Sequence, residues 1–170
     1  MLETERLFLR PLDENDIEAV FAMRSDKDVM QFIREPQNRD ETENWIRLVS
    51  RNWIKDKTGF CAVIEKRTNK FLGWCGVWRL QETNELEVGY AIVKDSWKRG
   101  FATEAAREFL EYGFVILKPD KITAVAEPKN TASRRVMEKL GMKFVKLGYF
   151  HNLNLVQYAI TKEDFLRKRE

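Results

Sequence analysis

The sequence predicts one α/β (α+β) domain over residues 1–170, built on a mixed, mostly antiparallel β-sheet that helices flank. First, strand-like and helix-like periodicities alternate along the chain, and no linker, repeat or low-complexity stretch interrupts them. Second, a strand–helix–strand unit over 85–127 predicts a parallel pair with a right-handed crossover. Third, 44% of the 170 residues are hydrophobic, which is enough for one sizeable core.

The N-terminal half predicts three strands and two helices. In order, these are a strand at 4–10, a helix from Asp13, a helix at 40–55 and strands at 59–65 and 71–78. The first helix carries an apolar stripe at Ile17, Val20 and Phe21. The polar segment 66–70 separates two apolar runs and therefore predicts a β-hairpin.

The C-terminal half alternates strands and helices and then ends on two strands and a short helix. The elements are a strand at 85–93, a helix through Leu117, a strand at 121–127, a helix at 131–140, strands at 143–150 and 155–160, and a helix at 162–168. Asn130 or Ser133 can cap the helix at 131–140, and Gly141 suits the left-handed residue just past its end. Its apolar stripe is Ala132, Val136, Met137 and Leu140.

A basic turn that contains a glycine joins the strand at 85–93 to the next helix. It reads Trp97-Lys98-Arg99-Gly100-Phe101-Ala102-Thr103. Amides at a helix start have no intrahelical acceptor, and the helix dipole adds partial positive charge, so a bound phosphate would satisfy both. Most basic turns of this kind bind no ligand, so this segment alone does not predict a phosphate site.

A second motif is the run Asn130-Thr131-Ala132-Ser133, which opens the helix at 131–140 ahead of Leu140-Gly141-Met142. The two segments together resemble the GNAT superfamily of acyl-CoA N-acyltransferases, in which the turn is Arg/Gln-x-x-Gly-x-Gly/Ala and the later helix begins Asn-x-x-Ser or Asn-x-x-Ala. The opening segment 3–12 and Glu87-Val88-Gly89-Tyr90 look like the branch that contains the ribosomal-protein N-terminal acetyltransferases. The resemblance covers the chain and implies splayed central parallel strands.

The resemblance implies acetyl-CoA as the acyl donor, held where the strands at 85–93 and 121–127 separate. The backbone of Tyr90, Ala91, Ile92 and Val93 would bond the pantetheine. The pyrophosphate would lie on the amides of Lys98, Arg99, Gly100, Phe101, Ala102 and Thr103. Asn130 and Ser133 match family positions near the pantetheine and the sulfur, and Lys98, Arg99 and Arg134 are candidates to contact the phosphates. A solvated surface cation is the more common role for each of these three residues.

The resemblance also implies direct attack of an amine on the thioester in a ternary complex. Glu87 is the candidate base, directly or through water, although a purely structural carboxylate explains it equally well. Ser133 is the candidate donor to the leaving thiolate, or only a first-turn helix residue. His151, in a polar connection, is a base, an acceptor contact or, most often for such a position, neither.

Two positions depart from the family pattern. Trp97 stands where Arg or Gln is usual in the phosphate turn, which removes a side-chain contact and leaves the amides. Met137 stands where many relatives have the tyrosine that protonates the thiolate, and methionine has no acidic proton. A thiol pKa of about 8.5 makes thiolate a fair leaving group without an acid. A weak base suits an α-amine of pKa about 8 better than a lysine-type amine of about 10.

The composition of the chain bounds its ligands, its location and the roles of its cysteines and histidine. Residues 94–170 carry 16 Lys and Arg against 10 Asp and Glu, which suits a polyanionic cofactor or a solvated surface. No apolar run reaches the roughly 18 residues of a membrane span, and no signal peptide begins the chain, so we expect no membrane partner and a cytoplasmic location. Cys61 and Cys75 lie in apolar strands and predict buried free thiols. A single histidine argues against a metal site.

The leading hypothesis is an acetyl-CoA-dependent N-acetyltransferase whose acceptor is a peptide or ribosomal-protein N-terminus. A small amine, such as an antibiotic or a polyamine, is the second acceptor class. A non-catalytic acyl-CoA-binding sensor is the alternative function. A nucleic-acid-binding module is disfavoured, because the aromatic–basic interleaving of such modules is absent. Relatives are often dimeric, so the resemblance also implies a homodimer through the last helix or an exposed strand.

Overall fold

The computed structural model describes residues 1–167, in which eight strands form one sheet in the order β1-β2-β3-β4-β5-β6-β8-β7. The strands are β1 (Leu2–Glu3), β2 (Leu7–Pro11), β3 (Gly59–Glu65), β4 (Lys70–Arg79), β5 (Leu86–Ile92), β6 (Lys121–Ala126), β7 (Lys143–Phe150) and β8 (Leu153–Thr161). The α-helices are α1 (Ile17–Arg24), α2 (Lys27–Met30), α3 (Arg39–Asp56), α4 (Phe101–Tyr112), α5 (Thr131–Leu140) and α6 (Lys162–Arg167).

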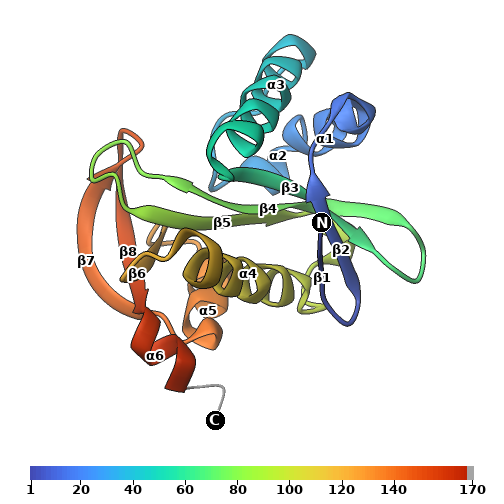
Figure 1. The fold of residues 1–170 in the computed structure, drawn as a ribbon. Helices are drawn as coiled ribbons and strands as arrows, with labels where there is room; N and C mark the ends of the chain where they lie inside the picture. Colours follow the sequence, from blue (N-terminus) through green and yellow to red (C-terminus); the bar gives the residue numbers. More distant parts are fainter. Residues whose placement is uncertain (168–170) are drawn as a thin grey trace.

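Helices cover both faces of the sheet, and each face has its own core. α1, α2 and α3 lie on one face, and α4 and α5 lie on the other (Figure 1). The core under α4 and α5 includes Phe101, Phe109 and Leu140, all essentially inaccessible to water. The opposite core packs Ile46 of α3 against Trp74 of the sheet. The predicted single-domain, mostly antiparallel mixed sheet flanked by helices is confirmed.

The strands β5 and β6 are the parallel pair, and they separate almost at once. Their only paired positions are Glu87 and Thr123, whereas every other neighbouring pair is antiparallel. Beyond that point, the second half of β5 has β4 on one side and no ladder on the other. The splay predicted for the centre of the sheet is therefore present, and it opens directly after Glu87.

The β7–β8 hairpin bends so that its tip meets the β4–β5 connection at residues 80–85 (Figure 1). Leu80, Phe150 and Leu155 form a small buried cluster that fastens the tip. The backbone N–H of His151 donates to Glu82 Oε1 at 2.6 Å, which adds a polar tie. The bend thus brings a residue from near the C-terminus next to the start of β5.

Most element boundaries agree with the sequence, and the differences have local causes. The helix expected from Asp13 begins later, because Asp13 caps a single 3₁₀ turn, Glu14–Asp16, that precedes α1. α2 was not expected, since four residues are too few to show a periodicity. The helix expected through Leu117 changes to π geometry over Gly113–Leu117. Ala132, expected in a buried stripe, is exposed.

The capping residues of α5 follow the sequence closely. Asn130 caps the helix through Oδ1, which accepts from the Ser133 amide at 3.0 Å, and Gly141 is left-handed at φ 88°. The last helix matches the expected one as far as Arg167, and residue 168 lies outside the described residues. Within residues 1–167, no helix combines the length and the apolar character that crossing a membrane requires.

Candidate active site

The glycine turn lies at the N-terminus of α4, as its sequence indicates. Gly100 is the N-cap residue at φ 83°, and no side chain caps this helix end. Lys98 is also left-handed, at φ 61°, so the chain reverses sharply just before the helix. The amides of Phe101, Ala102 and Thr103 therefore lack side-chain acceptors and face the space beyond the helix end.

Of the two basic side chains in the turn, Arg99 is the one that already contacts other residues of the protein. Its Nη2 donates to the buried carboxylate of Glu65 at 2.8 Å, and its guanidinium lies 4.6 Å from the centre of the Phe101 ring. Lys98 is exposed, and within residues 1–167 its ammonium group forms no hydrogen bond or ion pair. Lys98 is thus the freer of the two for contact with an anion.

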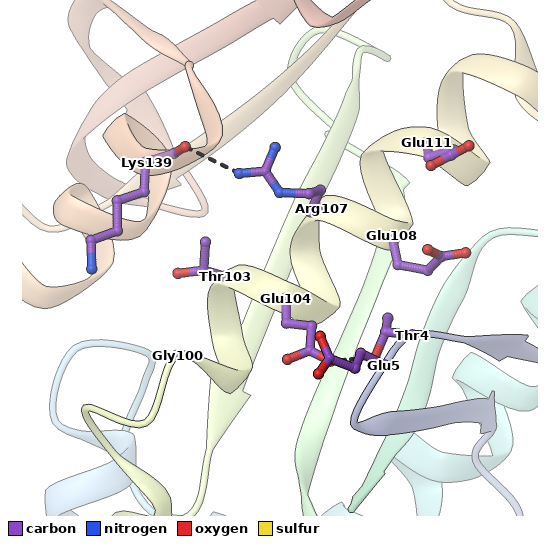
Figure 2. A pocket seen from close by; sticks show the side chains of 9 residues that line it. All are labelled: Thr4, Glu5, Gly100, Thr103, Glu104, Arg107, Glu108, Glu111 and Lys139. Atoms are coloured by element: carbon purple, nitrogen blue, oxygen red, sulfur yellow. Dashed lines mark hydrogen bonds between the residues drawn. The ribbon is translucent and has the colours of Figure 1, made fainter. Parts of the chain in front are cut away.

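A cavity of about 470 Å³ begins at this turn and follows the outer face of α4 (Figure 2). It is lined by Thr4, Glu5, Gly100, Thr103, Glu104, Arg107, Glu108, Glu111 and Lys139. Arg6 neutralises Glu104 through a bond from Nε at 2.6 Å, and Arg107 donates to the carbonyl of Lys139 at 3.3 Å. Glu108 and Glu111 lie away from Gly100 and Glu104 is paired with Arg6, so the end at Gly100 is the one that suits an anion.

The free edge of β5 offers fewer backbone groups than the sequence suggested. The Val93 N–H donates to Leu72 O on β4 at 2.8 Å. Because both backbone groups of a residue point to the same side of an antiparallel strand, Val93 and Ala91 face β4, and Tyr90 and Ile92 face the splay. The Ile92 carbonyl accepts from the Trp97 indole at 2.6 Å. Of the four residues at 90–93 that were expected to bond the pantetheine, only Tyr90 and Ile92 direct backbone groups to the free edge, and the Ile92 carbonyl already has a partner.

Tyr90 spans the splay from β5 to the start of α5. Its hydroxyl donates to the Ser133 carbonyl at 3.1 Å and lies 3.2 Å from Ser133 Oγ. Burial raises the pKa of Tyr90 above its ordinary value. Met137 is fully buried one turn further along α5. The phenol of Tyr90 and the alcohol of Ser133 thus meet one helical turn from Met137, the position at which the resembled family often has a tyrosine.

Arg134, in the same helix turn, is held by the protein itself. Its Nε donates to the Tyr158 hydroxyl at 3.3 Å, and its Nη1 donates to the Pro128 carbonyl at 3.2 Å. The bond to Tyr158 raises the pKa of Arg134. The guanidinium is therefore fixed beside the N-terminus of α5, where its charge adds to that of the helix end.

The predicted base, Glu87, lies on the opposite face of β5 from Tyr90. Side chains alternate along a strand, so Glu87 shares a face with Ala91, which packs in the α1–α3 core. Only 4% of its side chain is exposed, and burial raises its pKa. The two predicted catalytic residues, Glu87 and Ser133, therefore reach the splay from opposite faces of the sheet and do not touch each other.

His151 is the partner of Glu87, a contact that the sequence did not predict. The Nε2 atom of His151 lies 3.1 Å from Glu87 Oε2, and 40% of the histidine side chain is exposed. The bond to Glu87 raises the pKa of His151. The available sequence signal was only that this is the single histidine of the chain.

A second cavity, of about 510 Å³, lies on the same side of the sheet as α2. It is lined by Lys27, Met30, Gln31, Ile33, Arg34, Glu35, Pro36, Glu127 and Leu153. Arg34 also acts electrostatically on His151, and Leu153 lies two residues after it. The cavity thus lies near His151 and presents charges of both signs.

The two cysteines are structural, as predicted. Cys61 and Cys75 are register partners in β3 and β4, both fully buried and both free thiols. Burial raises the pKa of Cys61 to about 12. Neither thiol is available as a nucleophile at neutral pH.

Comparison with known proteins agrees with this geometry. The family model described as an acetyltransferase (GNAT) domain matches residues 6–143. The Bacillus subtilis (strain 168) protein YkkB is 35% identical over 148 residues, covering 85% of this chain and 86% of its own. YoaA of the same organism, named an N-acetyltransferase, is 33% identical over 147 residues, covering 84% of this chain and 82% of its own.

Among solved structures, a GNAT-family acetyltransferase from Bacillus anthracis superposes with a TM-score of 0.80 at 30% identity. The superposition covers 95% of this chain and 98% of the Bacillus anthracis one. The chain belongs to the GNAT acetyltransferase family. It is an N-acetyltransferase, and acetyl-CoA is the donor expected of that family.

Proposed function

We propose that this protein transfers the acetyl group of acetyl-CoA to the α-amine of a peptide or protein N-terminus by direct attack in a ternary complex. The observation that carries the proposal is the position of Glu87, a buried carboxylate at the point where β5 and β6 separate. A proton-accepting group there would stand beside a thioester laid into the splay, on the side that faces the second cavity.

The donor would be held mainly by backbone groups. The pantetheine would bond the free edge of β5 at Tyr90 and Ile92, and the pyrophosphate would accept from the amides of the turn at 98–103. The open N-terminus of α4 and the exposed Lys98 support this placement. Asn130 and Arg134 would contribute through the start of α5, the first by shaping the helix end and the second by its charge.

The chemistry divides between the two faces of β5. On the side of the second cavity, Glu87 would receive the amine proton, directly or through an intermediary, as the C–N bond forms. On the other side, the Tyr90–Ser133 pair lies where the thiolate would leave, and its hydroxyls would stabilise that charge. A thiolate of pKa about 8.5 leaves without full protonation, so the methionine at 137 is no obstacle.

An α-amine fits the second cavity and its base better than a lysine-type amine does. An α-amine has a pKa of about 8 and is partly neutral at physiological pH, so a weak base suffices. The cavity carries Glu35 and Glu127 as well as Lys27 and Arg34, which suits a zwitterionic peptide backbone more than a polycation. Small antibiotic or polyamine amines are the competing acceptors.

The test is amine-dependent release of the coenzyme A thiol, measured against N-terminal peptides, polyamines and aminoglycosides. Glu87→Gln should lose turnover and keep acetyl-CoA binding, and Gly100→Glu should lose binding. Turnover with a small amine alone would reassign the acceptor. Tight acetyl-CoA binding without transfer to any amine would favour a cofactor sensor, and the absence of binding would refute the proposal.

We propose further that the protein is a cytoplasmic homodimer, the state that the resemblance implies. The edge strand β7 exposes Phe144, Val145, Leu147 and Tyr149, an apolar surface that a second copy would cover. Light scattering should then give twice the chain mass of 20.2 kDa. A single-chain mass at micromolar concentration would contradict the dimer.

A further inference from the structure

We propose that His151 is the residue that takes the proton from the acceptor amine, and that Glu87 is a positioning residue that holds its imidazole. This inference rests on the proposed acetyl transfer and changes which side chain meets the substrate. The sequence favoured Glu87 as the base and left His151 as one possible base or acceptor contact.

The hydrogen bond between the two side chains fixes how the imidazole is presented. Nε2 lies 3.1 Å from Glu87 Oε2, so the neutral ring donates its Nε2–H to the carboxylate. In that tautomer the lone pair is on Nδ1, which becomes the proton acceptor. Among residues 1–167, none forms a hydrogen bond with Nδ1, which is therefore free for an incoming amine.

Accessibility distinguishes the two side chains. An amine that approaches from solvent meets the histidine, whose side chain is 40% exposed, before the carboxylate, which is 4% exposed. Arg34, which lines the second cavity, acts electrostatically on His151, and Leu153, which also lines it, follows His151 by two residues. Glu87 is enclosed too deeply to contact an amine without a relay, and the imidazole occupies the position of that relay.

The fold holds His151 in place from several directions. Its amide is bonded to Glu82, and the residue before it, Phe150, is buried with Leu80 and Leu155. His151 itself is left-handed at φ 50°, a conformation that a residue with a Cβ rarely adopts unless the surroundings enforce it. A solvated loop histidine needs none of these contacts.

The charges around the ring suit a group that gains a proton during the reaction. Glu87 on β5 and Glu82 on the β4–β5 connection both favour the imidazolium, and Arg34, from the segment before α3, opposes it. The bond to Glu87 dominates and raises the pKa of His151. Transfer of the amine proton to Nδ1 is therefore stabilised by the carboxylate bonded to Nε2.

The step balances without any further reactant. The amine lone pair forms the C–N bond, the C–S bond breaks, and its electron pair leaves on the thiolate. The N–H proton passes to Nδ1 and then to solvent through the exposed side of the ring. The thiolate takes a proton from water, or from the Tyr90–Ser133 side, to give the free thiol.

The first test compares the pH dependence of kcat in three variants, with one peptide acceptor throughout. His151→Asn keeps a residue that tolerates the left-handed backbone and removes the proton acceptor, so kcat should fall about 100-fold or more and the acid limb due to histidine should vanish. Glu87→Gln should lower kcat and move that limb to lower pH. Glu85→Gln, a charge-matched control that pairs with Lys121, should leave the profile unchanged.

The second test observes the imidazole directly, because a chain with one histidine gives one imidazole signal in NMR. Its titration should match the acid limb of kcat and shift to lower pH in Glu87→Gln. Equal titration in both proteins would overturn the inference.

A His151→Asn enzyme with wild-type kcat and an unchanged acid limb would also overturn it, and would leave the proposed function standing with Glu87 as the base. Failure of the wild type to acetylate any amine would refute the proposed function and this inference together. Acetyl-CoA affinity should stay unchanged in His151→Asn, since a general loss of fold would lower it as well.

Discussion

Replacing Gly100 by alanine should separate the cost of backbone strain from the cost to cofactor binding. Gly100 has φ 83°, and Gly141, at the end of α5, has φ 88°. A Cβ at position 100 would meet only the Arg6 guanidinium, at an ordinary 3.5 Å. Its structural cost is thus the left-handed backbone alone, about 1–2 kcal/mol of unfolding free energy.

Gly141→Ala is the matched control, since it imposes a similar backbone cost at the far end of α5, about 15 Å from that helix's N-terminus. Urea unfolding should show a loss of about 1–2 kcal/mol or more in both variants. Calorimetric titration with acetyl-CoA should show at least a tenfold weaker Kd, about 1.4 kcal/mol, for Gly100→Ala alone. Equal Kd values for the two variants would refute the assignment of the phosphates to this turn.

Three further predictions concern buried groups. Arg24 is 2% exposed, burial lowers its pKa to about 10, and it lies 4.1 Å over Trp45. The lowered pKa corresponds to a cost of about 3 kcal/mol for keeping the guanidinium charged. The cation–π contact with Trp45 offsets about 1–2 kcal/mol of that cost. Arg24→Met should therefore leave the free energy of unfolding unchanged or raise it. A loss above about 2 kcal/mol in urea would contradict this. Cys61 and Cys75 should react with a thiol reagent only in denaturant, and reaction in the native protein would refute their burial. Because burial raises the pKa of Glu87, the folded state retains its proton longer, so wild-type stability relative to Glu87→Gln should fall as pH rises above about 4.3. The opposite slope in paired unfolding curves would contradict it.

Sequence patterns predicted those parts of the fold that neighbouring residues decide. Asn130 caps α5 and Gly141 ends it in the left-handed conformation, because both effects act within one helical turn. β3 matches its predicted range because an apolar run bounded by turn residues defines a buried strand. The splay after Glu87 followed from the family resemblance, since no local pattern encodes the separation of two strands.

The contacts that sequence reasoning missed join distant residues. His151 and Glu87 are 64 positions apart and meet only because the β7–β8 hairpin bends onto the β4–β5 connection. The Trp97 indole donates a hydrogen bond to the Ile92 carbonyl, and this contact depends on the reversal of the chain at the glycine turn. Arg24 is buried against the indoles of Trp45 and Trp74 despite its charge, and burial of that kind depends on tertiary packing rather than on any periodicity.

The most direct test of the account is a crystal structure of the protein with coenzyme A. The account predicts the pantetheine on the free edge of β5 at Tyr90 and Ile92, the pyrophosphate on the turn at 98–103, and the sulfur between the Tyr90–Ser133 pair and the Glu87–His151 pair. A coenzyme bound elsewhere, with its sulfur remote from both pairs, would contradict the assignment of this site to acetyl transfer.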